Sequence, residues 1–197
     1  PLDGVVVKIT GNTKTETYDG TEKAASGYSV VASNPLYTTN DFTFSGKAEV
    51  KKTDAGSYNM GLKAENFKNK DNNNFANVTF VVEKDGQLVI NPRSVTLKSE
   101  GGSKAYDGTA LTKPDVTVTG DGFVDGEVTN IRATGTITDV GTVTNTIEYE
   151  KSAKFKESNY TIAKEEGQLT IAPLDGVVVK ITGNTKTETY DGTEKAA

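Results

Sequence analysis

The chain has 197 residues with a net charge of −5, and it contains no cysteine, histidine or tryptophan. This composition excludes disulfide bonds, thiolate metal sites and catalysis by a histidine-activated nucleophile. The absence of clustered positive charge argues against nucleic-acid binding. No apolar run approaches the roughly 20 residues of a membrane span, so we expect no membrane insertion in this segment.

The sequence repeats itself. Residues 1–25 recur letter for letter as residues 173–197, and a diverged copy begins at Arg93. An exact internal repeat indicates a tandem array of similar domains. All three copies contain the motif Tyr-Asp-Gly-Thr, which begins at Tyr18, Tyr106 and Tyr190.

These copies divide the chain into units joined by short, proline-containing links. Asn91-Pro92 and Ala172-Pro173 follow the last apolar stretch of each unit almost immediately. Proline stiffens a link and stops a strand from simply continuing, which predicts a semi-rigid rod. We therefore expect unit one at residues 1–92, unit two at residues 93–172 and the start of a third unit at residues 173–197.

Alternating apolar and polar residues predict six to eight short strands in each unit. The clearest strand of unit one presents Tyr58, Met60 and Leu62 on one face. Its counterpart in unit two has Asn145 where Met60 stands, and an unpartnered buried amide is costly, so we expect that strand to be partly exposed. The other expected strands of unit one lie near residues 5–10, 28–31, 42–50, 78–82 and 87–90.

Aspartate beside glycine marks the turns between these strands, because glycine accepts a positive φ and aspartate can bond its own backbone. We expect the Tyr-Asp-Gly-Thr motifs and the Asp-Val-Gly motif to be structural turns, with Tyr18 and Tyr106 packed against their own units. The predicted turn residues are Tyr18, Asp19, Gly20, Tyr106, Asp107, Gly108, Asp139 and Gly141.

Many short strands with turn signals between them predict an all-β fold, an antiparallel β-sandwich that is Ig-like in the broad sense. The alternative is a β-grasp-like unit, which requires a helix. Residues 63–70 and 151–158 are the candidates for it, but both segments are short and polar.

Unit two contains, in this order, the motifs Gly120 to Phe123, Asp139 to Thr142, Asn159 to Ile162 and Glu166 to Pro173. This order of motifs resembles the MBG-type repeats of large bacterial cell-surface adhesins. Unit one shares Asp54-Ala55-Gly56-Ser57-Tyr58 and the closing Gly-Gln-Leu, but it has an Asn-rich insert. The resemblance implies an extracellular, tandemly arrayed β domain on a bacterial surface, often in Gram-positive organisms, and it supplies no catalytic residue and no cofactor.

Three kinds of site chemistry can be weighed on the residues alone. The carboxylates of Asp121, Asp125 and Glu127 could form a catalytic pair or a weak calcium site, but aspartate next to glycine is more often a turn, so we expect no enzyme. A second calcium-like pattern, Asn69, Asp71 and Asn73, lacks the glycine and the bidentate glutamate of a calcium loop. An isopeptide bond between Lys8 and Asn91 is disfavoured, because Lys8 should point to solvent.

Two functions remain open. The units are expected to be stalk repeats that hold a distal binding region away from the cell, with neighbouring repeats as their partners. The alternative is that each repeat weakly binds a host glycan or protein and acts through avidity, with Tyr37, Tyr149 and residues 69–74 as contacts. The last segment, residues 173–197, cannot bury a core alone, so if it is ordered we expect it to pair with unit two or with another chain.

Overall fold

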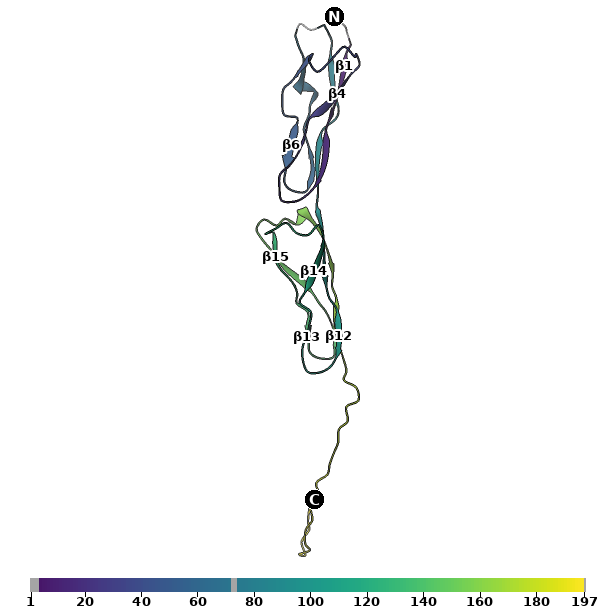
Figure 1. Cartoon of the computed structure of the whole chain (residues 1–197), viewed down its shortest axis with the longest axis vertical. Helices are drawn as coiled ribbons and strands as arrows, with labels where there is room; N and C mark the ends of the chain where they lie inside the picture. The colour runs from purple at the N-terminus through teal and green to yellow at the C-terminus, as the bar shows by residue number, and fades with distance from the viewer. Residues whose placement is uncertain (1–3, 72–73, 197) are drawn as a thin grey trace.

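In each unit the chain runs along the long axis of the molecule five times. We call each run a pass, and each pass consists of two consecutive strands or short segments. The computed structural model describes residues 4–71 and 74–196, and the two units lie end to end (Figure 1). The strands of unit one are β1 (Val6–Gly11), β2 (Thr13–Thr17), β3 (Lys23–Ser26), β4 (Tyr28–Ala32), β5 (Phe42–Phe44), β6 (Glu49–Lys52), β7 (Gly56–Asn59), β8 (Phe67–Asn69), β9 (Thr79–Lys84) and β10 (Gln87–Asn91).

Unit two repeats this order. Its strands are β11 (Arg93–Ser99), β12 (Gly102–Ala105), β13 (Leu111–Thr112), β14 (Val116–Gly120), β15 (Val128–Ala133), β16 (Thr136–Ile137), β17 (Gly141–Thr144), β18 (Ile147–Lys151), β19 (Tyr160–Glu165) and β20 (Gln168–Ala172). The 3-10 turns η1 (Ala64–Asn66) and η2 (Glu157–Asn159) are the only helical elements of the described residues. The all-β prediction is confirmed, and neither candidate segment forms the α-helix of a β-grasp unit.

The passes exchange partners halfway along each unit. In the half of unit one nearer the N-terminus the sheet order is β4-β1-β9, and in the other half it is β2-β10-β7. The pairs β5–β8 and β3–β6 form the second layers, and unit two has the equivalent sheets β14-β11-β19, β12-β20-β17, β15-β18 and β13-β16. This two-layer arrangement is sandwich-like.

The structure corrects two details of the predicted sandwich. Within the described residues, each unit contains ten strands instead of six to eight, because the long passes are interrupted at their midpoints. The sheets are also mixed and not purely antiparallel, since β1 pairs with β9, and β2 with β10, in parallel. The same parallel pairs recur in unit two as β11–β19 and β12–β20.

Close backbone contact between the first and last passes explains the closing Gly-Gln-Leu motif. A Cβ placed on Gly11 would lie 2.0 Å from the backbone nitrogen of Gly86, and one on Gly167 would lie 2.4 Å from the backbone nitrogen of Gly101. Only a residue without a side chain permits this approach. The acidic residue before each glycine also has a structural role: Asp85 accepts hydrogen bonds from the Gly61 and Leu62 amides.

Gly167→Ala is expected to destabilise unit two by about 2–3 kcal/mol, because the added methyl group must displace backbone atoms. Chemical denaturation followed by circular dichroism measures this loss. Gly183→Ala is the matched control, since a Cβ there meets no heavy atom within 4 Å. Equal stability of the two variants would contradict the assigned role of Gly167.

Asn145 is buried, contrary to the expectation of a partly exposed strand. Its side chain is fully inaccessible, and it donates to the carbonyls of Glu100 (2.9 Å) and Lys113 (2.7 Å) while accepting from the Gly135 amide (3.0 Å). Three hydrogen bonds satisfy the amide, so Asn145 can face inward in the break between β17 and β18 without an apolar residue there.

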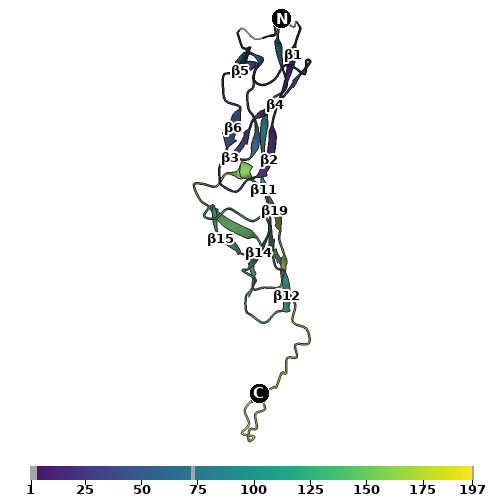
Figure 2. The same cartoon turned by 45° about the horizontal axis from the view of Figure 1, so that its top comes forward.

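The C-terminal segment does not pair with unit two. Residues 173–196 are exposed, contain no strand and run away from the end of unit two (Figures 1 and 2). The Tyr-Asp-Gly-Thr turn nevertheless forms there, because Thr193 bonds to Asp191 Oδ1 through its amide (3.0 Å) and its hydroxyl (2.6 Å). The turn is therefore encoded locally. In the described part of the chain, no helix has the length and apolar character of a membrane span.

Candidate interface between the two units

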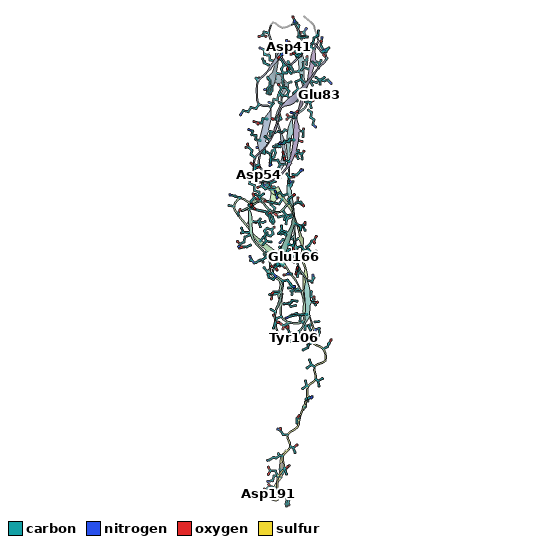
Figure 3. All side chains as sticks on the ribbon, viewed as in Figure 1. Asp41, Asp54, Glu83, Tyr106, Glu166 and Asp191 are labelled. Atoms are coloured by element: carbon teal, nitrogen blue, oxygen red, sulfur yellow. The ribbon has the colours of Figure 1, made fainter. Side chains whose placement is uncertain are left out.

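The end of unit one that faces unit two is formed by two turns. One is the Tyr-Asp-Gly-Thr turn at Tyr18, and the other contains Asp54, which Figure 3 shows where the units meet. Asp19 Oδ1 accepts from the Thr21 amide at 2.9 Å and from its hydroxyl at 2.6 Å. Gly20 has a φ of 81°, which favours glycine. This turn fixes Tyr18 at the tip of the unit.

Tyr18 packs against unit two, so the prediction that it packs within its own unit is wrong. Its hydroxyl donates to Glu127 Oε1 at 2.5 Å, and the hydroxyl of Tyr160 donates to Glu127 Oε2 at 2.7 Å. The two rings meet edge to face with centroids 5.7 Å apart. Tyr18 and Glu127 are only 3% and 4% exposed, so a buried carboxylate links two tyrosines from different units.

Aromatic and apolar side chains of unit two support this cluster. Phe155 stacks on Tyr160 with centroids 5.2 Å apart, and Phe123 lies 5.3 Å from the same ring. The Val124 amide donates to the Tyr160 hydroxyl at 3.0 Å. Val124 also covers the turn of unit one, since a Cβ on Gly20 would lie 3.0 Å from its Cγ1. The buried apolar cluster of unit one thus continues into unit two.

A second polar contact joins the Asp54 turn to the start of β19. Asn159 accepts from the Ala55 amide at 2.7 Å and donates to Asp54 Oδ1 at 3.1 Å, and it is fully buried. Lys156 forms an ion pair with Asp54 Oδ2 at 2.6 Å. The hydrogen bonds from Lys156 and Asn159 lower the pKa of Asp54. We call the whole contact region between the two units the joint. Its Asp54 side therefore loses stability as the pH falls through the lowered pKa of Asp54.

Hydrogen bonds to both units also hold the link between them in place. Only Pro92 separates β10 from β11. The guanidinium of Arg93 donates to the Tyr18 carbonyl in unit one (3.3 Å) and to the Gly122 carbonyl in unit two (2.9 Å), with a further bond to the Asp121 carbonyl. One side chain thus bridges both units next to the proline.

The tyrosines of the joint predict its response to alkali. Burial, with the hydrogen bond to Glu127, raises the pKa of Tyr18 to about 12, and burial also raises the pKa of Tyr160. A raised pKa means that the neutral phenol stabilises the folded joint. This stabilisation is complete below about pH 10, the ordinary tyrosine value, and is lost as the pH rises through 12.

We therefore expect inter-unit contacts to weaken as the pH rises above about 10 and to be lost as it rises through 12, because the two phenols ionise more readily when the joint is open. Phenolate absorbance, measured together with fluorescence energy transfer between the units, follows both events. Tyr18→Phe should remove one late-titrating phenol, whereas Tyr190→Phe, at a ring that is 90% exposed, is the control that leaves joint opening unchanged. A transition unaffected by Tyr18→Phe would contradict the assignment.

The other predicted turn residues lie at the free end of unit two. Asp107 accepts from the Thr109 amide (2.9 Å), so its turn has the geometry of the Asp19 turn, and Gly108 has a φ of 77°. Tyr106 is 39% exposed, so unit two covers its side chain only in part. Asp139 is exposed and Gly141 begins β17.

The calcium candidates of unit two are used for protein contacts or point to solvent. Asp121 Oδ2 accepts from the Ser94 amide at 2.9 Å, Glu127 binds the two tyrosines, and Asp125 is exposed. Among the described residues, no group of three or more acidic, histidine or cysteine side chains is placed to hold a metal ion. Asn73, from the other pattern, lies outside the described residues.

The isopeptide candidates Lys8 and Asn91 and the surface-contact candidate Tyr37 form other contacts. Lys8 forms an ion pair with Glu83 at 2.6 Å, and the Asn91 carbonyl accepts from the Tyr18 amide at 2.8 Å. Tyr37 is only 5% exposed, with its hydroxyl donating to Asn69 at 2.9 Å, so it is a core residue and not a surface contact.

Comparison with known proteins identifies one family. The model of the MBG domain matches residues 5–92, which is the whole of unit one except its first residues. No curated protein and no solved structure matches the chain. The resemblance to MBG-type repeats is thereby confirmed for the unit that carries the Asn-rich insert.

Proposed function

We propose that the two units, the first of which is matched by the MBG domain model over residues 5–92, are stalk repeats of a bacterial cell-surface adhesin or surface fibre. In this role they project a distal binding region from the cell. The observation that carries the proposal is the joint, where buried polar groups of both units are paired with each other.

The contacts of the joint resist bending in more than one direction. The Tyr18 turn and the Asp54 turn contact unit two separately, and Arg93 ties down the link next to Pro92. Opening the joint would expose the Glu127 carboxylate cluster, and the fully buried Asn159 would lose both of its inter-unit bonds. Groups that are satisfied only when the units are docked favour one relative orientation.

The alternative function is weak binding of a host glycan or protein by each repeat. The observation in its favour is a shallow depression of unit two lined by Arg132, Glu148, Tyr149, Glu150 and Lys164. The ammonium of Lys164 lies 5.2 Å from the centre of the Tyr149 ring, so part of that ring is already covered. We therefore prefer the stalk function.

The proposal is tested by measuring how far the units hold a tip domain from a cell surface. One, two or three copies of residues 1–172 are placed between a cell-wall anchor and a tip domain, and the height of the tip is measured by fluorescence. A stalk predicts that height increases in proportion to copy number. A height that does not grow with the copies contradicts the stalk function.

A glycan array probed with the whole chain tests the alternative. We expect no saturable binding. Saturable binding that is lost in Tyr149→Ala, with Tyr190→Ala as the exposed control, would establish the binding function instead.

A further inference from the structure

The two outer ends of the two-unit rod expose large apolar side chains. At the free end of unit two, Tyr106 is 39% exposed and Val140 is 53% exposed. At the opposite end, in the loop between β4 and β5 of unit one, Leu36 is 69% exposed. Figure 3 shows Tyr106 at one end of the two-unit body and Asp41, from the same loop as Leu36, at the other.

The free end of unit two repeats the end of unit one that is covered in the joint. The Tyr18 amide bonds to the Asn91 carbonyl at 2.8 Å, and the Tyr106 amide bonds to the Ala172 carbonyl at the same distance. Val140 occupies the place of Ala55 in the matching Asp-x-Gly turn. The backbone is the same, yet Tyr18 is 3% exposed and Tyr106 is 39% exposed.

Unit one also carries the counterpart of the residue that covers this surface in the joint. Ser33 accepts from the Val6 amide at 2.9 Å, as Asp121 accepts from the Ser94 amide, so these two positions correspond. Leu36 follows Ser33 by three residues, as Val124 follows Asp121. Val124 is the side chain that lies over Gly20. Leu36 therefore has the position needed to lie over Gly108.

We infer that the end of unit two formed by Tyr106, Gly108 and Val140 is a docking surface for another unit one in the same chain. The occupant is the unit that starts at Pro173, because residues 173–197 repeat residues 1–25 and leave β20 through a proline as Pro92 leaves β10. The inference rests on the proposed array of repeats, but not on adhesion.

This second joint differs in chemistry from the first. The unit-one loop at residues 33–41 contains no glutamate, and Val78 stands before β9 where Tyr160 begins β19. The carboxylate between two tyrosines therefore has no counterpart. Docking relies on apolar contact of Leu36 and Val140 with the Tyr106 ring, so the array alternates a polar joint with an apolar one.

The test completes the third unit by adding residues 26–92 after Ala197. Hydroxyl-radical footprinting with mass spectrometry then compares this chain with residues 1–197. We expect at least a fivefold lower reaction rate at Tyr106 and Val140 in the completed chain. Val118 is the internal control, since it has the same 39% exposure as Tyr106 but lies on β14.

Leu36→Asp in the added copy should restore the reactivity of Tyr106, and because Leu36 is exposed, the unit itself should still fold. A chain with residues 93–172 followed by residues 1–92 forms the same joint by a second route. If Tyr106 reacts as fast in either of these chains as it does in residues 1–197, while the unit one that follows it is folded, the inference is overturned. So does protection that appears only with increasing concentration of residues 1–197, which would mean docking between separate chains. None of these results depends on tip height, so the stalk function is tested separately.

Discussion

Asn145→Ala is expected to destabilise unit two by about 4 kcal/mol. The substitution leaves the carbonyls of Glu100 and Lys113 and the amide of Gly135 without their side-chain partner. Each such group costs about 1–3 kcal/mol when it stays buried. Since Asn145 is fully inaccessible, water cannot replace the amide without disturbing the core.

Chemical denaturation followed by hydrogen exchange of each unit measures this loss. Unit one is the internal reference, because distant sites contribute independently and its stability should not change. Asn74→Ala, at an exposed position, is the control for the residue type. A loss below about 1 kcal/mol in unit two would show that the three hydrogen bonds of the Asn145 side chain contribute little to the stability of the unit.

Glu127→Ala is expected to shift the equilibrium of the joint towards the open form by about 3 kcal/mol, or roughly 100-fold. It removes the acceptor of both the Tyr18 and the Tyr160 hydroxyl groups, and each buried hydroxyl without a partner costs about 1–3 kcal/mol. The strand pairing within the two units does not involve this side chain, so we expect each unit to remain folded.

Spin labels at Lys47→Cys and Thr138→Cys provide the measurement, because the chain has no other cysteine and both positions are exposed. The docked joint should give one narrow distance distribution, which broadens in Glu127→Ala. Glu127→Gln keeps one acceptor oxygen and is expected to broaden it much less. An unchanged distribution in Glu127→Ala would falsify the role of the carboxylate in stiffness.

The local features of the chain could be predicted from its sequence because they depend on neighbouring residues. The Asp-Gly-Thr turn forms at Asp19, Asp107 and even at Asp191, where no core supports it. Burial also follows the local pattern: Leu62 and Ile147 are both buried, as the alternation of apolar and polar residues predicts. The all-β class followed from these two signals together.

Pairing at long range could not be predicted in this way. Alternation shows which face of a strand is buried, but it does not name the neighbouring strand, so the parallel pairs β1–β9 and β2–β10 were missed. Asn145 was misjudged for the same reason, since its partner carbonyls lie 45 and 32 residues away.

The interface between the two units could not be predicted from the sequence for a related reason. Tyr18 and Tyr106 have the same local motif, and their surroundings differ because Tyr18 contacts Glu127, 109 residues away, and Tyr160 of unit two. A glutamate after Asp-Gly looks like part of an acidic turn. One available signal was that Glu127, Asn159 and Tyr160 all lie in segments of unit two that differ from unit one.

The parallel pairs also determine how the rod carries tension. The chain enters each unit at one end through β1 or β11 and leaves at the other through β10 or β20 (Figure 1). A pull on the termini therefore acts along these strands and across their hydrogen bonds, which are loaded in shear and must break together. We expect single-molecule pulling through the termini to need more force than pulling across the β3–β6 pair, whose bonds can open one at a time. Equal forces would contradict this view.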